Sequence, residues 1–196
     1  MILLHETENC FQALKLIDIN KINKAVKILA VLKTKPYNRE DAVQYATRWA
    51  LGRNPRFYDY TNLGGDCTSF ASQVIFSGAT VMNYTHVYGW YYINGNEKSP
   101  SWTGVDFLYQ FLIRNREQGP FAQEVSLSQI QPGDIIQIFF GNQQHYNHSL
   151  AVTKIGFPNN PDQIFVATHT PDFLDRKFSS YQWVAARYLH ILGVNM

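Results

Sequence analysis

Cys67 is the residue of this sequence whose type and surroundings are best suited to covalent chemistry. It follows Gly64, Gly65 and Asp66, and apolar residues recur after it at helical spacing, so a helix is expected to begin there. A helix N-terminus carries a partial positive charge and unpaired N–H groups, which lower the pKa of a thiol and can hold an oxyanion. The glycines allow close approach of a substrate. The sequence therefore predicts Cys67 to be a nucleophile.

A cysteine nucleophile needs a base, and histidine is the usual one. The chain has six histidines, at positions 5, 86, 145, 148, 169 and 190. His148 stands at the start of an expected strand, and a rigid strand end holds a base at a fixed distance. His169 ends the next expected strand. If the two strands are neighbours, His169 could bond one nitrogen of His148 and leave the other facing the thiol. We therefore expect Cys67, His148 and His169 to be the nucleophile, the base and the orienting residue.

The same residue types also have structural interpretations. A cysteine is commonly a small buried apolar residue, and His169 could be a bonded core or edge residue. Aromatic residues build cores but also line grooves that hold polymers. Asp66 either caps the expected helix or contacts a polar group of the substrate. The residues that we predict to bind substrate flank Cys67 or lie in the aromatic segment after it: Asp66, Tyr58, Tyr60, Trp90 and Trp102.

The elements expected to position these residues change character half-way along the chain. Helices are predicted after Asn38, after Cys67 and over residues 105–116, from the spacing of their apolar residues. The second half predicts strands separated by turns, over residues 135–140, 150–155, 164–169 and 183–192. Helices followed by consecutive strands indicate the α+β class, with an antiparallel sheet.

Residues 1–35 are expected to form an N-terminal helical extension. Isoleucine, valine and leucine at positions 19, 22, 26 and 29 share one helical face, and lysines at 21, 24 and 27 lie on another. Such a helix either packs on the main domain with a solvated lysine face or anchors the chain on an anionic polymer or membrane. Pro36 ends the pattern, so the main domain is predicted to span residues 36–196.

Composition and charge exclude several classes of protein. With 196 residues, 45% of them hydrophobic, the chain fits one folded domain with a short extension. A net charge of +2 does not favour nucleic-acid binding. Two cysteines, Cys10 and Cys67, do not make a disulfide framework. No apolar run reaches the roughly 18 residues that a transmembrane segment needs, and residues 1–11 lack the features of a secretory signal.

One segment resembles a known family. Residues 65–73, GDCTSFASQ, are similar to the signature of bacterial putative amidase domains, which are related to the NlpC/P60 and CHAP groups of papain-like peptidoglycan hydrolases. The resemblance covers about residues 36–190 and includes five further short segments: Tyr37-Asn38-Arg39, Ser101-Trp102-Thr103, Pro132-Gly133-Asp134-Ile135-Ile136, His148-Ser149 and Thr168-His169-Thr170.

The resemblance implies a papain-like, NlpC/P60-like fold in which N-terminal helices pack on a central antiparallel sheet. It implies Cys67 as nucleophile, His148 as base and His169 as third residue. The substrate that it implies is a peptide or amide, typically a cell-wall peptide, and members of the family are usually exported. We expect no metal or other cofactor.

Three alternatives to a cysteine amide hydrolase follow from the same residues. One is a non-catalytic cell-wall-binding module, against which the intact Cys67 and His148 argue. Another is a cysteine acyltransferase, which would use the same acyl-enzyme with an amine as acceptor. The third is a zinc hydrolase with His145, His148, His169 and Asp172 as ligands, although His145 and His148 fall in an expected loop and not on a helix.

Overall fold

The centre of the protein is an antiparallel sheet. The computed structural model describes residues 33–140 and 145–196. Within them, seven strands form one sheet in the order β1-β7-β3-β4-β5-β6, with β2 also paired to β7, and every pairing is antiparallel. The strands are β1 (Thr34–Lys35), β2 (Gly119–Val125), β3 (Ile135–Phe139), β4 (His148–Ile155), β5 (Ile164–Thr168), β6 (Phe173–Lys177) and β7 (Ala185–Asn195).

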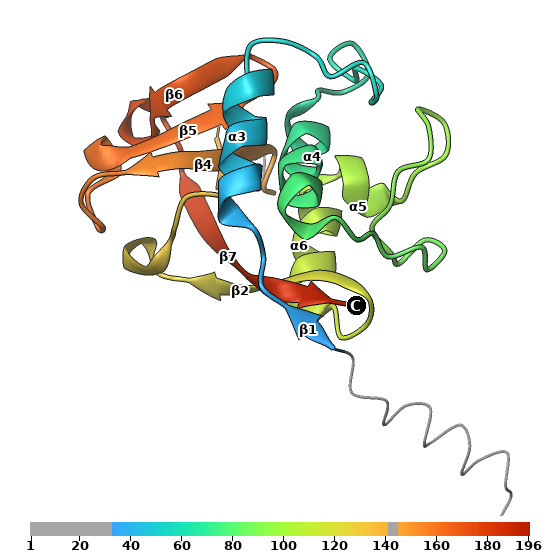
Figure 1. The fold of residues 1–196 in the computed structure, drawn as a ribbon. Coiled ribbons are helices and arrows are strands. Elements are labelled where there is room, and N and C mark those ends of the chain that lie inside the picture. Colours follow the sequence, from blue (N-terminus) through green and yellow to red (C-terminus); the bar gives the residue numbers. More distant parts are fainter. Residues whose placement is uncertain (1–32, 141–144) are drawn as a thin grey trace, which may run out of the picture. The chain divides into compact units, whose positions relative to one another are not determined.

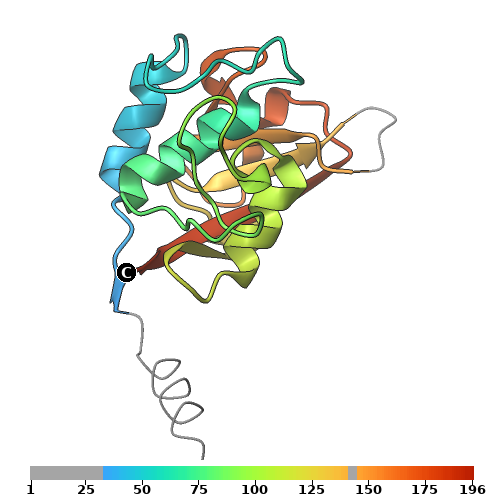
Figure 2. The ribbon, with the colours of Figure 1, turned by 90° about the vertical axis from the view of Figure 1, so that its right-hand side faces the viewer.

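Helices that precede β2 in the sequence cover one face of this sheet. They are α3 (Arg39–Trp49), α4 (Cys67–Ala79), α5 (Pro100–Thr103) and α6 (Val105–Arg114). In Figure 1 α4, α5 and α6 lie to one side of the strands, and Figure 2, viewed from that side, shows them in front of the sheet. The side chain of Asn38 caps α3 by accepting the N–H of Asp41, at 3.2 Å. The predicted α+β class with an antiparallel sheet is therefore confirmed.

Two hydrophobic clusters lie on opposite faces of the sheet. The first joins α3, α4 and α6 to the sheet and includes Phe70, Ala151 and Ala167. The second includes Leu150 and Val166 and is covered by Phe178 from the short 3-10 turn after β6. Because successive side chains of a strand point to opposite faces, residues 149 and 151 of β4 face α4, and residues 148 and 150 face away. This alternation decides which candidate site residues can meet.

The sheet contains strands that the sequence did not predict. β2 begins with Gly119 and Pro120, which were expected only to end a helix, and β6 mixes Asp175 and Arg176 into a short apolar segment. The two residues of β1 pair with the end of β7 although the sequence assigned them to the extension. The rest of that extension, residues 1–32, lies outside the described residues. Among the helices that the structure describes, none is long and apolar enough to cross a membrane.

Trp102 lies at the centre of an aromatic cluster that joins α4, α5 and the segment before α4. Its ring centroid lies 5.1 Å from that of Trp90, 5.7 Å from Phe57 and 6.4 Å from Phe76. Both tryptophans are completely buried in the core. In this structure they are therefore packing residues, and they have no surface that could contact a substrate.

Replacing Trp102 by Ala is expected to lower the free energy of unfolding by about 3–5 kcal/mol, because it removes a fully buried ring and leaves a cavity. Urea denaturation of the full chain measures this loss. Phe157→Ala is the control, since Phe157 is 73% exposed and its loss should change the free energy by no more than about 0.5 kcal/mol. Equal effects of the two changes would contradict the packing described here.

Candidate active site

The sulfur of Cys67 lies where the N-terminus of α4 meets the start of β4. Gly64 and Gly65 precede it with positive φ values of 94° and 105°, a conformation that suits glycine. The first helical hydrogen bond runs from the N–H of Phe70 to the carbonyl of Asp66, at 2.9 Å, so the N–H groups of the first turn have no partner within the helix. The backbone N–H groups of Ser149 and Thr68 lie close to the sulfur and favour its thiolate form, which lowers the pKa.

Hydroxyl groups complete this junction between helix and strand. The hydroxyl of Thr68 lies 3.7 Å from the sulfur of Cys67 and 3.0 Å from the hydroxyl of Ser149. The side chain of Gln137, on β3, donates to the same serine hydroxyl at 3.3 Å. The sulfur is therefore held among hydrogen-bond donors on the face of the sheet that α4 covers.

Burial decides the ionisation of this thiol. Burial raises the pKa of Cys67 above its ordinary value, the hydrogen bonds from Ser149 and Thr68 oppose that rise, and the carboxylate of Asp66 adds to it. The helix N-terminus was expected to lower this pKa, but burial is the larger effect in the described environment. Cys67 therefore rests as a neutral thiol at pH 7, and its activation requires a base.

His148 lies on the other face of the same strand. Its Nε2 lies 3.3 Å from the hydroxyl of Thr168, and its ring is 5.9 Å from that of Phe140 and 6.3 Å from that of Tyr181. Burial, aided by the positive charge of Arg176, lowers its pKa to about 4. The imidazole is therefore neutral at pH 7 and able to accept a proton.

The sulfur of Cys67 and the imidazole of His148 lie beside consecutive residues of β4 without being joined. The backbone N–H of Ser149 lies close to the sulfur, and the imidazole belongs to the preceding residue. The side chains of His148 and Ser149 nevertheless point to opposite faces, and among the described residues no hydrogen bond links the sulfur to an imidazole. Direct proton transfer requires the His148 side chain to turn at the end of the strand, or a water molecule to connect the two groups.

His169 makes different contacts from those that the sequence suggested. Its Nδ1 lies 2.6 Å from Oδ2 of Asp66, its Nε2 donates to the carbonyl of Trp49 at 2.9 Å, and its ring stacks on Phe70 at 4.0 Å. Alternation along β5 explains this, because residue 168 faces His148 and residue 169 faces α4. The expected contact between His148 and His169 is absent, and Thr168 takes that place.

The contacts of the His169 ring require a proton between its Nδ1 and the carboxyl group of Asp66. A carbonyl can only accept a hydrogen bond, so Nε2 of His169 carries a hydrogen. The short contact on the other side then needs a second proton between Nδ1 and the carboxyl oxygen of Asp66. An imidazolium with a carboxylate, or a neutral imidazole with a carboxylic acid, both satisfy this requirement. His169 thereby anchors the residue that precedes Cys67 to α3.

Asp66 is the centre of this polar network. Its carboxylate also accepts the N–H of Tyr60 at 3.2 Å, and its own N–H donates to the hydroxyl of Thr170 at 2.9 Å. Nε of Arg53 lies 3.7 Å from it, and Arg53 pairs with Asp172 through two bonds of 2.8 and 3.0 Å. Asp66 makes no side-chain cap of α4, and because it is 1% exposed it does not reach the surface to contact a substrate.

The predicted aromatic groove is only partly present at the surface. Tyr58 is half exposed and its ring lies 5.0 Å from that of Tyr60. Tyr60 is buried, and its hydroxyl donates to the carbonyl of Gly95 at 2.9 Å. With Trp90 and Trp102 in the core, Tyr58 is the predicted aromatic residue that could touch a substrate.

Sequence reasoning missed the residues that hold the site together: Ser149, Thr168, Arg53 and Arg176. Ser149 and Thr168 stand next to the two histidines in the short segments that carried the family resemblance. That adjacency was a usable signal for them. Arg53 and Arg176 had no such signal, because their contacts depend on segments that are distant in the sequence.

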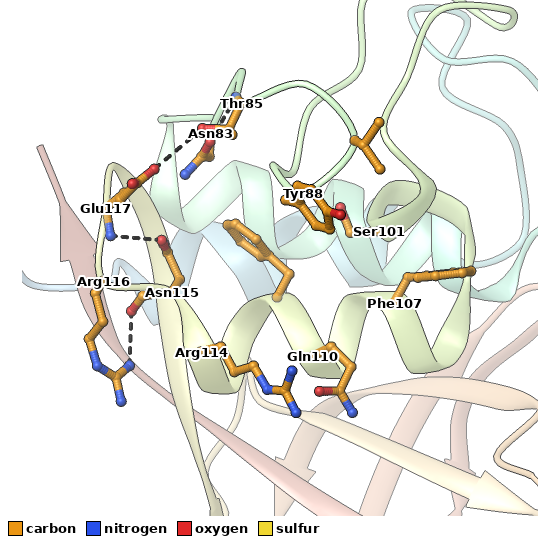
Figure 3. Close-up of a pocket in the computed structure, with 12 residues that line it drawn as sticks. Asn83, Thr85, Tyr88, Ser101, Phe107, Gln110, Arg114, Asn115, Arg116 and Glu117 are labelled. Atoms are coloured by element: carbon orange, nitrogen blue, oxygen red, sulfur yellow. Dashed lines mark hydrogen bonds between the residues drawn. The ribbon is translucent and has the colours of Figure 1, made fainter.

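Cavities in the described part of the protein include one beside His148 and one beside α6. A cavity of about 510 Å³ is lined by His148 and Arg176. Another, of about 400 Å³, lies between α6 and residues 83–88, and Figure 3 shows Gln110 and Arg114 of α6 on one side of it and Tyr88 and Ser101 on another. None of the predicted site residues lines this second cavity.

The candidate zinc ligands do not form a cluster in the described part of the chain. Among residues 33–140 and 145–196, no three His, Cys, Asp or Glu side chains lie close enough together to hold a metal ion. His148 and His169 face opposite sides of the sheet, which separates two of the four candidates. The described residues therefore offer no support for the zinc alternative.

Replacing Asp66 by Ala should lower the free energy of unfolding by about 3–5 kcal/mol, because it leaves the ring of His169 without its buried partner. Chemical denaturation of the full chain measures this. Asp106→Ala is the matched control. Asp106 pairs with Arg187 at 2.7 Å but is 48% exposed, so the loss there should be about 0–1 kcal/mol. A loss at Asp66 no larger than at Asp106 would contradict the buried pair.

The alkylation rate of Cys67 by iodoacetamide should still be rising above pH 9. Burial raises the pKa of this thiol, and only the thiolate reacts, so its reactive fraction grows at a higher pH than for an ordinary thiol. Mass spectrometry of the labelled peptide gives the rate, with Cys10→Ser protein removing the other cysteine and glutathione as the reference thiol. A rate that is already constant near pH 7 would show a resting thiolate instead.

Comparison with known proteins identifies the family. The chain is 29% identical over 127 residues to the uncharacterized protein YhbB of Bacillus subtilis (strain 168); the alignment covers 64% of this chain and 40% of that longer protein. No solved structure matches the chain. The sequence model described as putative amidase domain matches residues 36–192. The chain therefore belongs to the putative amidase domain family.

Proposed function

We propose that this protein is a cysteine-dependent hydrolase of peptide amides, with Cys67 as nucleophile and His148 as base. Membership of the amidase-domain family indicates amide hydrolysis. The cysteine mechanism rests on one observation above all. The sulfur lies at the N-terminus of a 13-residue helix, close to backbone N–H groups of that helix and of β4, the strand that also carries a neutral histidine on its other face.

The proposed reaction begins with transfer of the thiol proton to His148. The thiolate attacks the amide carbonyl carbon, and N–H groups of the first turn of α4 stabilise the oxyanion of the tetrahedral intermediate. The protonated His148 then gives its proton to the leaving amine as the carbon–nitrogen bond breaks. Water, deprotonated by His148, attacks the resulting thioester, and the carboxylate product and the thiol are released.

The proposal includes one movement of His148. Its ring is bonded to Thr168 on the face of β4 away from Cys67, so the side chain must turn, or act through water, before it takes the proton. His148 is the first residue of its strand, at the end where the pairing between β3 and β4 stops. The contact with Thr168 accordingly fixes the resting position of the His148 side chain. His169 contributes indirectly, because its contact with Asp66 helps to fix the position of Cys67.

The fold and the substrate are proposed from the same features. The papain-like fold that the sequence resemblance implies is supported by a cysteine at a helix start, packed on an antiparallel sheet with histidines at the start and end of neighbouring strands. That resemblance also implies peptidoglycan peptides as substrates, and the half-exposed Tyr58 offers an aromatic surface beside the segment before Cys67. Acyl transfer to an amine would use the same thioester, with only the acceptor changed.

Cys67→Ala should lower the hydrolysis of peptidoglycan peptides by about 10³-fold or more, because no acyl-enzyme can form. Mass spectrometry of fragments after digestion by each variant measures it, and added amines reveal transfer products. Cys10→Ser is the matched control and should leave the rate unchanged. His148→Ala should cost about 10²- to 10⁴-fold.

Unchanged hydrolysis by Cys67→Ala protein would end the cysteine mechanism. His169 would be the base if His148→Ala protein kept full activity and His169→Ala protein lost it. The near-ultraviolet circular dichroism of the His169→Ala protein must be unchanged, which shows that the variant is folded. Binding of peptidoglycan by the wild type without any cleavage would favour the binding-module alternative.

A further inference from the structure

The cavity beside His148 has one charged wall. Its volume is about 510 Å³, and its lining includes His148, Arg176, Ser180 and Tyr181. His148 is neutral at pH 7 because its pKa is lowered to about 4. The guanidinium of Arg176 is therefore the positive charge among the residues that line this cavity.

The guanidinium group of Arg176 is held in a fixed orientation, and its Nη1 is available to a ligand. Its guanidinium lies over the ring of Phe173 at 4.2 Å and over that of Tyr181 at 4.1 Å. Its Nε and Nη2 donate to the hydroxyl and carbonyl of Ser180, at 2.8 and 3.2 Å. Among the described residues, none accepts a hydrogen bond from its Nη1 and no carboxylate forms an ion pair with it. A planar cation fixed in this way is preorganised for an anion.

Tyr181 supplies an unused donor beside this cation. Its hydroxyl is buried beside Arg176, and in the described part of the chain it has no group to which it donates its hydrogen. Burial raises the pKa of Tyr181 to about 12, so the phenol is neutral at pH 7 and can donate. A buried donor without an acceptor costs free energy, and a ligand that accepts its hydrogen bond would recover that cost.

We propose that this cavity binds a carboxylate of the substrate, which Arg176 pairs and the hydroxyl of Tyr181 donates to. The substrate class is then an amide or peptide with a free carboxylate close to the bond that is cleaved. This inference rests on the proposed amide hydrolysis at Cys67 and His148 and extends it to substrate selection. A carboxylate matches the donor set because it accepts several hydrogen bonds in one plane.

Occupation of the cavity would also affect the proposed base. The positive charge of Arg176 contributes to the lowered pKa of His148, and a bound carboxylate offsets that charge. His148 would then hold a proton more readily when a matching substrate is present. Selection of the substrate and activation of the base would thus come from the same ion pair.

The test uses a pair of probes, N-acetyl-alanyl-alanine and its C-terminal amide, which differ only in the carboxylate. Binding to full-length Cys67→Ala protein, which cannot turn them over, is measured by nuclear magnetic resonance titration. The acid should bind about tenfold or more tightly than the amide. Adding Arg176→Gln should bring that ratio close to one, and Tyr181→Phe should lower it several-fold.

Matched variants separate recognition from folding. Arg176→Lys keeps the charge and stem but loses the planar fork, so the ratio should fall without loss of the fold. Arg114→Gln removes an equal charge from α6, outside this cavity, and should leave the ratio unchanged. Equal binding of the two probes, or a preference that survives both Arg176 variants, would overturn the carboxylate site.

The test distinguishes this inference from the function on which it rests. Loss of turnover in Cys67→Ala protein, combined with equal binding of acid and amide, keeps the hydrolase and rejects the carboxylate site. An Arg176-dependent preference for the acid, combined with no turnover by the wild type, keeps the site and rejects the hydrolase.

Discussion

The position of Cys67 depends on the buried contact between Asp66 and His169. The pair connects three segments that are far apart in the sequence, because the imidazole also bonds the carbonyl of Trp49 at the end of α3. A buried hydrogen bond stabilises the fold only when the remaining polar groups of both partners are also satisfied, and here the N–H of Tyr60 and the hydroxyl of Thr170 satisfy the remaining groups of Asp66. Since Asp66 immediately precedes Cys67, the network fixes where α4 starts and therefore where the sulfur lies.

The second constraint is the alternation of side chains along β4 and β5. Ser149 faces α4 and bonds Thr68, whereas His148 faces the opposite cavity and contacts Thr168. The strand thus separates the thiol on one face of the sheet from the imidazole on the other. In the proposed mechanism, the proton passes between the two faces at the end of β4 where His148 lies. The loop at that end includes residues 141–144, which lie outside the described part of the chain.

Much of the architecture could be predicted from the sequence, because helices with one apolar face and strands bounded by turns have clear periodicities. The helix after Cys67 and the strands over residues 135–139 and 164–168 are of this kind. The face of each histidine could not be predicted in the same way. The first six residues of β4 are all buried, so polar and apolar residues do not alternate there, and the sequence contains no sign of which side each residue faces. The tryptophans of the aromatic segment were equally ambiguous, since burial of a ring depends on what the fold brings over it.

Burial gives this site a resting state without an ion pair between nucleophile and base. It raises the pKa of the Cys67 thiol and lowers that of the His148 imidazole, so both changes oppose proton transfer from sulfur to nitrogen. Any catalytic use of the two groups must therefore draw on the substrate, which can exclude water, move the side chain of His148 or change the charge around it. Arg176 is the group through which a substrate could change that charge, because it is close enough to His148 to lower its pKa and has no carboxylate partner among the described residues. A neutral resting site of this kind would keep the thiol unreactive until a matching ligand is bound.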